Sequence, residues 1–535
     1  MKRFRLVWAI LFAIFMFAGC ATVQQKAYMP SDVEHSLVVL HTNDHHGHPL
    51  PFFNYPCPNQ GGLPARATLV NKVKAEATNV MLLDAGDFNT GRPESNFFQA
   101  EPDIKGYNYI KYDALAMGNH EFDLDREKMQ KQIAMSEFPW LCANAKKDGK
   151  YLENVKPYVI KEYEGFKVAL LGLLTSKTAE TGNPEHIRDI VFEDEVEVAS
   201  ELVPLLKKQA DIVIAVVHMG VYDDASQGSR RLAAKVPGIA LIVDGHSHTM
   251  LDEAVMVKNE VSGKEIPIVQ SKDWGLYIGR ADLKFKSGQV TSFSWSPLPV
   301  NIQKRIKKDG KKYCVYVGEE LAQQGELEVI LKPYRDKVEA LLNEVIGNAK
   351  KPFLNDNTRK METALGNIVA DSQLWYMKKM GFDIDFAFQN GGGIRATLGS
   401  GEIKKKTIYE VLPFDNSITV VTLKGSDVIA LFDQAAGNVG EGAMAQVSDG
   451  ISFTINTATG KAEDLLINYE PVDPERIYTI ALNSYLAAGG DGYNVFKKRT
   501  SFYDSSNMQR DAFIDYVIAI GGNISPITFD RITIK

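Results

Sequence analysis

Four of the ten histidines of this chain lie within residues 40–48, which read LHTNDHHGH. Asp44 lies among them, and the apolar run SLVVL comes directly before the cluster. Imidazole and carboxylate groups at this density are typical of a site for a divalent transition metal. A buried strand that ends in such a cluster therefore predicts a metal site at the edge of a sheet.

Four further apolar runs end in similar residues. NVMLLDAGD ends in Asp87, LAMGNHEFD in Asn119, His120 and Asp123, DIVIAVVHMG in His218, and GIALIVDGHSH in His246 and His248. Runs of Val, Ile and Leu without polar alternation indicate strands buried on both faces. Helix-like segments at 64–78 and 194–209 lie between them. Ligands gather beyond the carboxyl ends of strands in such sheets, so five strand ends are expected to converge.

Asp-x-His and His-x-His spacings allow two side chains of one loop to face one ion, and a carboxylate such as Asp87 can bridge two ions. A pair of ions can bind a phosphoryl oxygen, activate water and stabilise a leaving oxygen. The alternative is that each histidine is an ordinary polar residue at a strand end. Eight of the ten histidines lie in these motifs, which favours a metal site.

Length and charge restrict the class of protein. A chain of 535 residues is too long for one compact core, so we expect two domains. A formal net charge of −7 argues against a nucleic-acid polymer as partner, because such partners need a basic surface. A small anionic substrate remains compatible, because the charge of a metal acts locally.

The first twenty residues predict export. Lys2, Arg3 and Arg5 precede a short apolar run that ends in Ala18-Gly19-Cys20. The small-small-Cys ending resembles the bacterial lipobox, in which the cysteine is lipidated and becomes the mature N-terminus. We expect a lipoprotein signal peptide at 1–19, a tether at 20–36, and a periplasmic or cell-surface protein held at the membrane only through Cys20. The alternative is a plain signal peptide or a short N-terminal anchor.

The remaining cysteines, Cys57, Cys142 and Cys314, allow one internal disulfide at most and lack the paired spacing of a zinc knuckle. We expect them to be structural or incidental, with Cys57 the most exposed. Residues 325–347 follow helical spacing and predict an interdomain helix that Pro333 starts or kinks. The chain beyond 353 has its own strands and glycine clusters, QNGGGIRA and AAGGDGYN.

The motifs DHH, GD, GNHEFD, VHMG and GHSH, in this order, resemble those of calcineurin-like metallophosphoesterases. A longer match, which includes NTGRPES, GGGIR, LPF and GGDGY, resembles the bacterial 5′-nucleotidase/UDP-sugar hydrolase family from about residue 37 to the end. The resemblance implies an α/β (α+β) fold: a four-layer αββα sandwich at 37–324, a linker helix at 325–352, and a smaller C-terminal α/β nucleotide-binding domain at 353–535.

The resemblance also implies two divalent metal ions, Zn, Mn or Co. The ligands of one would be Asp44, His46, Asp87 and His248, and those of the other Asp87, Asn119, His218 and His246. His248 stands where some relatives carry Gln, which leaves the preferred metal open. His120 and Asp123 match the catalytic pair, although Asp123 could instead be a helix cap. We expect His45 and His48 to be loop or rim residues.

The matching substrate residues lie in the second half: Arg359, Asn390, Gly392, Gly393, Arg395, Phe414, Tyr485 and Asp491. The two aromatic rings would sandwich a base. The alternatives are structural roles: a surface charge for Arg359, a tight turn for the glycines, core packing for the aromatic residues and a turn residue for Asp491. Asn355 stands where some relatives carry a further arginine, so contacts with a second phosphate could differ.

These observations predict an extracytoplasmic 5′-nucleotidase in which activated water attacks the phosphorus of a nucleoside 5′-monophosphate, with UDP-sugars and nucleoside di- and triphosphates as further substrates. Enzymatic alternatives are a 2′,3′-cyclic-nucleotide phosphodiesterase with 3′-nucleotidase activity, an NAD pyrophosphatase and, ranked lower, a sulfur-oxidation hydrolase. The alternative from another class is a non-catalytic surface nucleotide-binding protein.

Overall fold

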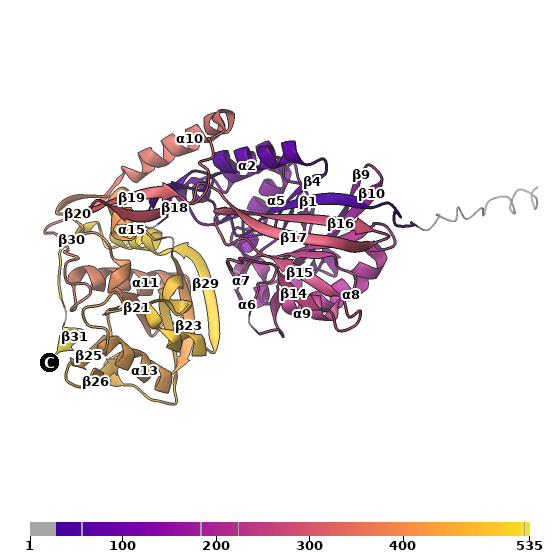
Figure 1. Ribbon diagram of the computed structural model, residues 1–535. Coiled ribbons are helices and arrows are strands. Elements are labelled where there is room, and N and C mark those ends of the chain that lie inside the picture. Colours follow the sequence, from indigo (N-terminus) through magenta and orange to yellow (C-terminus); the bar gives the residue numbers. More distant parts are fainter. Residues whose placement is uncertain (1–27, 55–56, 182–183, 223, 415, 529) are drawn as a thin grey trace, which may run out of the picture.

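A computed structural model describes residues 28–535 except 55–56, 182–183, 223, 415 and 529. The predicted signal peptide and Cys20 therefore lie outside the described residues. The described residues form two lobes joined near helix α10 (Figure 1). These residues contain all of the hydrophobic core clusters. None of the described helices combines the length and apolar character needed to cross a membrane.

The N-terminal lobe contains two six-stranded sheets. The first has the order β17 (Gln289–Pro299), β16 (Tyr277–Lys286), β1 (His35–Thr42), β4 (Val80–Asp84), β5 (Ala114–Ala116), β6 (Trp140–Leu141). The second has the order β14 (Val255–Lys258), β15 (Glu265–Val269), β13 (Leu241–Val243), β12 (Ile212–His218), β10 (Phe166–Leu174), β9 (Tyr158–Tyr163). Val39 and Leu83 of the first sheet and Ile214 and Val243 of the second belong to one buried cluster, so the sheets pack face to face.

Helices cover the outer face of each sheet. Helices α2 (Leu63–Glu76), α4 (Glu101–Ile110) and α5 (Arg126–Met135) share a core with Leu40 and Leu82 of the first sheet. Helices α8 (Glu195–Leu206) and α9 (Gly228–Lys235) pack on Val213 and Ile242 of the second. The lobe is therefore the predicted four-layer αββα sandwich, and α2 and α8 are the two helices expected at 64–78 and 194–209.

Strand direction brings the predicted ligands to one edge of the lobe. Strand β1 runs parallel to β4, and β4 runs parallel to β5. In the second sheet, β12 runs parallel to both β10 and β13. The loops that follow β1, β4, β5, β12 and β13 hence leave the two packed sheets at the same edge.

Helix α10 (Gly325–Leu342) joins the lobes and contains Pro333 in its interior. Its Tyr334 hydroxyl donates a 2.6 Å hydrogen bond to Glu101 at the start of α4. The predicted helix at 325–347 is too long, because residues Val345–Ala349 form strand β20. This strand pairs with β22 (Gly401–Lys404) and β30 (Asn523–Ile524), so sheet pairing outweighs the helical spacing of Val345.

The C-terminal lobe is also a mixed α/β unit. Its main sheet has the order β24 (Ala445–Val447), β21 (Phe386–Asn390), β28 (Ile477–Asn483), β23 (Ser417–Lys424), β29 (Ser501–Met508). A second sheet has the order β27 (Glu470–Pro471), β26 (Lys461–Ile467), β25 (Ile451–Asn456), β31 (Ile532–Ile534). The longer helices are α11 (Ala364–Lys379), α12 (Lys405–Val411), α13 (Gly425–Ala436) and α15 (Gln509–Ala519). These elements build cores of their own.

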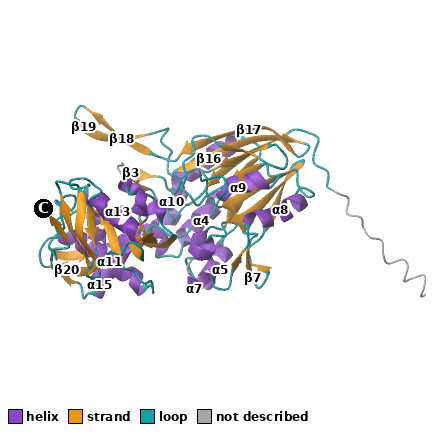
Figure 2. Ribbon diagram, turned by 90° about the horizontal axis from the view of Figure 1, so that it is seen from below, coloured by secondary structure: helices purple, strands orange, loops and turns teal. Residues whose placement is uncertain are grey.

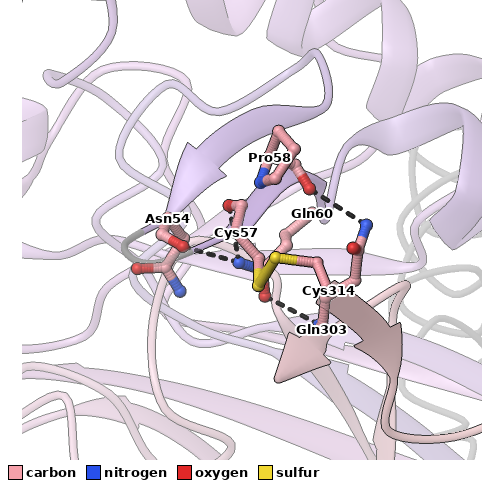
Figure 3. The surroundings of a disulfide bond; sticks show 6 residues. All are labelled: Asn54, Cys57, Pro58, Gln60, Gln303 and Cys314. Carbon is pink, nitrogen blue, oxygen red and sulfur yellow. Dashed lines mark hydrogen bonds between the residues drawn. A yellow bond between two sulfur atoms is a disulfide. The ribbon is translucent and has the colours of Figure 1, made fainter. Parts of the chain in front are cut away.

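A disulfide joins Cys57 to Cys314 across 257 residues of sequence (Figure 3). It connects strand β3 (Cys57–Gln60), which pairs with β2 (Phe52–Asn54), to the hairpin of β18 (Gln303–Lys308) and β19 (Lys311–Tyr316). The expectation of an exposed Cys57 is wrong, because its side chain is fully buried at this junction. Cys142 is a free, buried thiol.

Candidate active site

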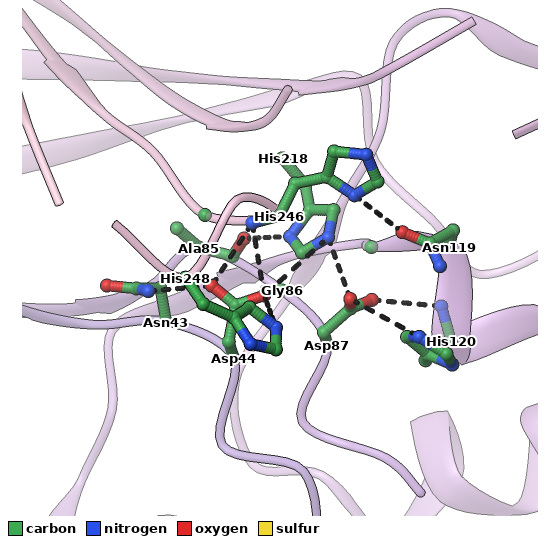
Figure 4. Close-up of polar contacts among 12 residues, drawn as sticks. Asn43, Asp44, Ala85, Gly86, Asp87, Asn119, His120, His218, His246 and His248 are labelled. Atoms are coloured by element: carbon green, nitrogen blue, oxygen red, sulfur yellow. Dashed lines mark hydrogen bonds and ion pairs between the residues drawn. The ribbon is translucent and has the colours of Figure 1, made fainter. Parts of the chain in front are cut away.

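The five strand-end loops converge on one group of side chains (Figure 4). Asp44 and His46 follow β1, Asp87 follows β4, and His218 is the last residue of β12. The other members are Asn119 and His120 in the short 3-10 helix η1 (Asn119–Phe122) after β5, and His246 and His248 after β13. The structure thus brings together all seven residues that the sequence suggested as metal ligands.

The ligand atoms form two adjoining clusters. Asp44, His46 and His248 offer atoms within 4.8 Å of one another, and so do Asp87, His218 and His246. The two clusters adjoin, because His218 Nε2 lies 2.9 Å from Asp87 Oδ2 and 3.9 Å from Asp44 Oδ1. The Asn119 amide completes the second cluster, with its oxygen 2.9 Å from His246 Nδ1. Asp87 lies close to ligands of both clusters and is the natural bridge.

The backbone adopts an uncommon conformation at five of the seven proposed ligands. Asp44, Asp87, His246 and His248 all have positive φ angles, of 49°, 55°, 77° and 51°, and His46 has 44°. This left-handed region is uncommon for residues other than glycine, although Asp, Asn and His adopt it more readily than most. The local backbone conformation sets the direction in which each of these side chains leaves its loop.

The four imidazole donors differ in charge state. Burial works to lower the pKa of His218 and His248, but Asp87 and Asp44 raise that of His218 to about 9 and Asp44 raises that of His248, so a metal ion would displace a proton from each of these two. Burial, with help from His120 and His248, lowers the pKa of His46 to about 3, and burial with His218 lowers that of His246 to about 3. Both imidazoles are therefore neutral and can offer a lone pair. Among the described residues, no lysine or arginine forms an ion pair with the buried carboxylates of Asp44 or Asp87. Cations from solution would satisfy them.

Surrounding groups orient the imidazoles. His218 Nδ1 donates to the carbonyl of Ala85 at 2.8 Å, which turns Nε2 toward the carboxylates, 2.9 Å from Asp87 Oδ2. His46 Nδ1 points at the carbonyls of Asn89 and Thr90, at 3.2 and 3.1 Å. Such outer contacts fix the tautomer and the direction of a ligand.

Sequence reasoning missed Glu121, although it lies inside the GNHEFD motif. Its buried carboxylate accepts hydrogen bonds from the backbone N–H groups of Asp87, Phe88 and Gly118, at 2.9, 3.0 and 2.6 Å. It therefore ties the loop after β4 to the loop after β5. The signal available in the sequence was a charged residue between His120 and Asp123, in a motif expected at the end of a buried strand.

The predicted pair His120 and Asp123 is in contact. His120 Nδ1 lies 2.8 Å from Asp123 Oδ2, and His120 Nε2 lies 3.9 Å from Asp87 Oδ2. Burial works to lower the pKa of His120, but the carboxylates of Asp123 and Asp87 hold it well above its ordinary value. Ser506 of β29, in the C-terminal lobe, places its hydroxyl 2.5 Å from His120 Nδ1. The two lobes thus meet at this pair.

His45 and His48 were expected to be loop or rim residues. Both lie in the loop after β1, but neither lies at a rim, because both are buried. His45 Nε2 lies 2.9 Å from Asp103, and its Nδ1 lies 3.1 Å from the fully buried guanidinium of Arg66. Arg66 also donates to the Tyr112 hydroxyl at 3.1 Å. Local sequence patterns do not predict this network beneath the loop after β1, since its members are far apart in the chain.

The predicted substrate residues form two local groups in the C-terminal lobe. The Asn390 amide and the Tyr485 hydroxyl donate to the two oxygens of Asp491, at 2.7 and 2.8 Å. The Arg395 guanidinium lies 5.8 Å from the centre of the Phe414 ring.

The remaining predicted members are Arg359 and the glycines. Arg359 is exposed, and its carbonyl accepts from Gly440 at 2.7 Å. Close backbone approaches explain the glycines: a side chain on Gly392 would meet Gly442 at 2.9 Å, and one on Gly393 would meet Gln389 at 2.5 Å. Tyr485 is 46% exposed, which is unusual for a core aromatic residue and leaves its ring available to a base.

Comparisons with known proteins agree with this architecture. Residues 37–250 match the calcineurin-like phosphoesterase family, and residues 345–498 match the 5′-nucleotidase C-terminal domain. A 5′-nucleotidase of Vibrio vulnificus is 36% identical over 510 residues, with 89% of each chain covered. The crystal structure of a 5′-nucleotidase precursor from Thermus thermophilus has a TM-score of 0.60 and 28% identity, covering 94% of this chain and 99% of that one.

A second solved structure, the NAD nucleotidase of Haemophilus influenzae, has a TM-score of 0.72 at 22% identity and covers 94% of this chain and 99% of that one, which shows the shared fold. The N-terminal lobe and its clustered ligands define a phosphoesterase that uses divalent metals, an enzyme that hydrolyses phosphoric esters. From its two domains and its relatives, the chain belongs to the 5′-nucleotidase family.

Proposed function

We propose that the protein removes the phosphate from nucleoside 5′-monophosphates, and that UDP-sugars and nucleoside di- and triphosphates are further substrates. The observation that carries the proposal is the pair of adjoining ligand clusters around Asp87 with the His120–Asp123 pair beside them. The Vibrio vulnificus relative, which is named as a 5′-nucleotidase, supports the choice of substrate.

Two divalent ions would occupy the clusters. Asp44, His46, Asp87 and His248 would hold one, and Asp87, Asn119, His218 and His246 the other. The mixture of carboxylate, amide and imidazole donors suits Zn, Mn or Co. Ions held in this way supply a Lewis acid for a phosphoryl oxygen and lower the pKa of water.

His120 would act on the developing charge at the phosphoryl group or protonate the leaving oxygen. Asp123 accepts from Nδ1 and so leaves Nε2 facing the clusters. Against the effect of burial, the carboxylate of Asp123 raises the pKa of His120 and so favours the protonated ring that this role needs. Asp123 itself acts by holding the ring, and Thr90 donates to the same carboxylate at 2.6 Å.

The C-terminal lobe would choose the nucleotide. Tyr485 and Phe414 would stack on the base, Asp491 would bind a ribose hydroxyl, and Asn390 and Arg395, with Arg359, would bind polar groups of the substrate. The element that touches His120 here is β29, not the loops that carry these residues. Catalysis would hence require rotation of one lobe on the other, with a hinge near α10.

We also propose that residues 1–19 direct export and that Cys20 carries a lipid anchor at the membrane. The basic residues, the apolar run and the small-small-Cys ending support this. Metabolic labelling with a fatty-acid analogue tests it: the natural chain should be labelled and a Cys20→Ser variant should not. Equal labelling of the two would contradict the anchor.

The test of function is phosphate release by the purified protein from AMP and UMP, with Mn²⁺, Zn²⁺ or Co²⁺ and with EDTA. UDP-glucose, NAD and a 2′,3′-cyclic nucleotide are assayed in parallel. Metal-dependent release from the 5′-monophosphates supports the proposal, and the UDP-glucose rate sets its breadth. Turnover of the cyclic nucleotide or NAD without turnover of AMP and UMP would overturn it. Nucleotide binding without turnover in metal-loaded protein would indicate a binding protein instead.

A further inference from the structure

The hairpin of β18 and β19 is a strongly basic projection on an acidic protein. It carries six cations, Lys304, Arg305, Lys307, Lys308, Lys311 and Lys312, and a single acid, Asp309, whereas the whole chain has a net charge of −7. Asp309 and Gly310 have φ angles of 51° and 76°, the two positive values that a tight type I′ hairpin turn requires. The hairpin stands clear of both lobes in Figure 2.

The lysines of the hairpin are placed where their charges destabilise it. Lys307 lies directly opposite Lys312, and Lys308 directly opposite Lys311. Like charges in opposite positions of an antiparallel pair repel each other. Among the residues that the structure describes, none of the five lysines forms an ion pair that could relieve this repulsion. An anionic partner would relieve it.

The two faces of the hairpin differ. Cys314 is bonded to Cys57 of β3, so the face that carries Cys314 turns toward the body of the lobe. Side chains alternate along a strand, and the opposite face therefore carries Lys304, Ile306 and Lys308 on β18 with Lys311, Tyr313 and Val315 on β19. Ile306 and Tyr313 are direct neighbours across the strands and are 37% and 46% exposed.

We infer that this hairpin, with Lys304, Ile306, Lys308, Lys311 and Tyr313 at its outer face, docks on an anionic lipid surface. Lysines that surround an exposed aromatic and aliphatic pair are suited to the membrane interface, where the two apolar side chains enter the headgroup region and the ammonium groups meet lipid phosphates. A soluble polyanion would use the lysines but would give the exposed Ile306–Tyr313 pair no role.

The disulfide holds the base of the hairpin in place before it meets such a surface. Besides the Cys57–Cys314 bond, the Gln303 amide donates to the Pro58 carbonyl at 3.0 Å, and its backbone N–H donates to Gln60 at 2.9 Å. The base of the hairpin is thus fixed to β3, so docking orders few groups and loses little entropy. The inference concerns a surface outside the active site and does not depend on the proposed substrate.

The test is co-sedimentation with vesicles of phosphatidylcholine alone or mixed with phosphatidylglycerol. We use the chain that begins at Ala21, since all of the cores lie within the described residues and lipidation at Cys20 is then absent. We expect binding to the mixed vesicles only, which weakens as salt rises. A variant with the outer-face residues Lys304, Lys308 and Lys311 changed to Gln should bind about tenfold or more weakly.

The matched control changes three other exposed lysines to Gln: Lys207, Lys208 and Lys286. It should bind as the parent does. An Ile306→Ser/Tyr313→Ser variant should lose vesicle binding but keep its retention on heparin. Absence of binding to the anionic vesicles, equal loss in the two lysine variants, or full vesicle binding by the serine variant would each overturn the inference. So would a fall in kcat/KM for AMP in the hairpin lysine variant with unchanged vesicle binding, since the cations would then serve the substrate.

Discussion

The catalytic role proposed for His120 depends on the residues that orient its imidazole ring. Asp123 contacts His120 at 2.8 Å and Thr90 at 2.6 Å, and these contacts leave the imidazole one orientation. The carboxylates around His120 also outweigh the effect of burial on its pKa. Loss of the Asp123 charge should hence lower the pKa of His120 without removing a proposed metal ligand.

Replacement Asp123→Asn should lower kcat for AMP by roughly 10²–10³-fold, the range of general acid catalysis, while bound metal stays constant. Steady-state kinetics and elemental analysis measure the two quantities. Asp125→Asn is the matched control, because Asp125 is a helix cap for α5 that Asn can also provide. An unchanged kcat in the Asp123 variant would remove the pair from the mechanism.

Arg66 gives a second prediction at this scale. Its guanidinium is fully buried and contacts His45, which lies between the proposed ligands Asp44 and His46. Arg66→Met would leave the Tyr112 hydroxyl and His45 without their donor, so stability should fall by about 2–4 kcal/mol and metal affinity by about 10–100-fold. Thermal unfolding with metal titration measures both; the exposed Arg188→Met is the control. Normal metal affinity in a destabilised variant would assign Arg66 to the core alone.

At the scale of elements, strand ends were predictable and long-range partners were not. The runs before Asp44, Asp87 and His218 are apolar on both faces, which indicates parallel strands, and parallel strands bring their ends together. The pairing of Cys57 with Cys314, and of His45 with Asp103 and Arg66, depends on contacts between distant segments that no local pattern records. The end of α10 was missed because β20 finds partners in another part of the chain.

The disulfide stabilises the base of the β18–β19 hairpin. Reduction, or the double replacement Cys57→Ser/Cys314→Ser, should lower stability by roughly 2–4 kcal/mol and make the hairpin sensitive to protease. Phosphate release well below the melting temperature should not change, because no site residue lies on these strands. Calorimetry with and without reductant gives the result, and the double variant should no longer respond to reductant. An unaltered melting temperature on reduction would contradict this account.

In the whole molecule, the proposed metal ligands and the proposed nucleotide-binding residues lie in different lobes. The metal clusters belong to the N-terminal lobe, whereas Tyr485, Asp491 and Asn390 belong to the C-terminal lobe. Affinity for the nucleoside should hence be separable from hydrolysis of a phosphate ester. The sequence suggested both groups of residues, but their relative position depends on the lobe arrangement, which local patterns do not determine.

Tyr485→Ala should raise KM for AMP about tenfold, because stacking on a base is worth roughly 1–3 kcal/mol. The rate with p-nitrophenyl phosphate, which has no nucleobase, should be unaffected. Tyr469→Ala in the same lobe, where the ring is 78% exposed, should change neither. An equal loss with both substrates would assign Tyr485 to folding of the lobe instead of recognition.

The most direct measurement is activity against metal content in protein stripped by chelator and then titrated with Mn²⁺. We expect phosphate release from AMP to rise with the ion and to reach its maximum near two ions per chain, by the ligand sets around Asp87. Asp87→Asn should bind less metal and show almost no turnover. Full turnover in protein without bound metal, or an Asp87→Asn variant as active as the parent, would contradict the dimetal account.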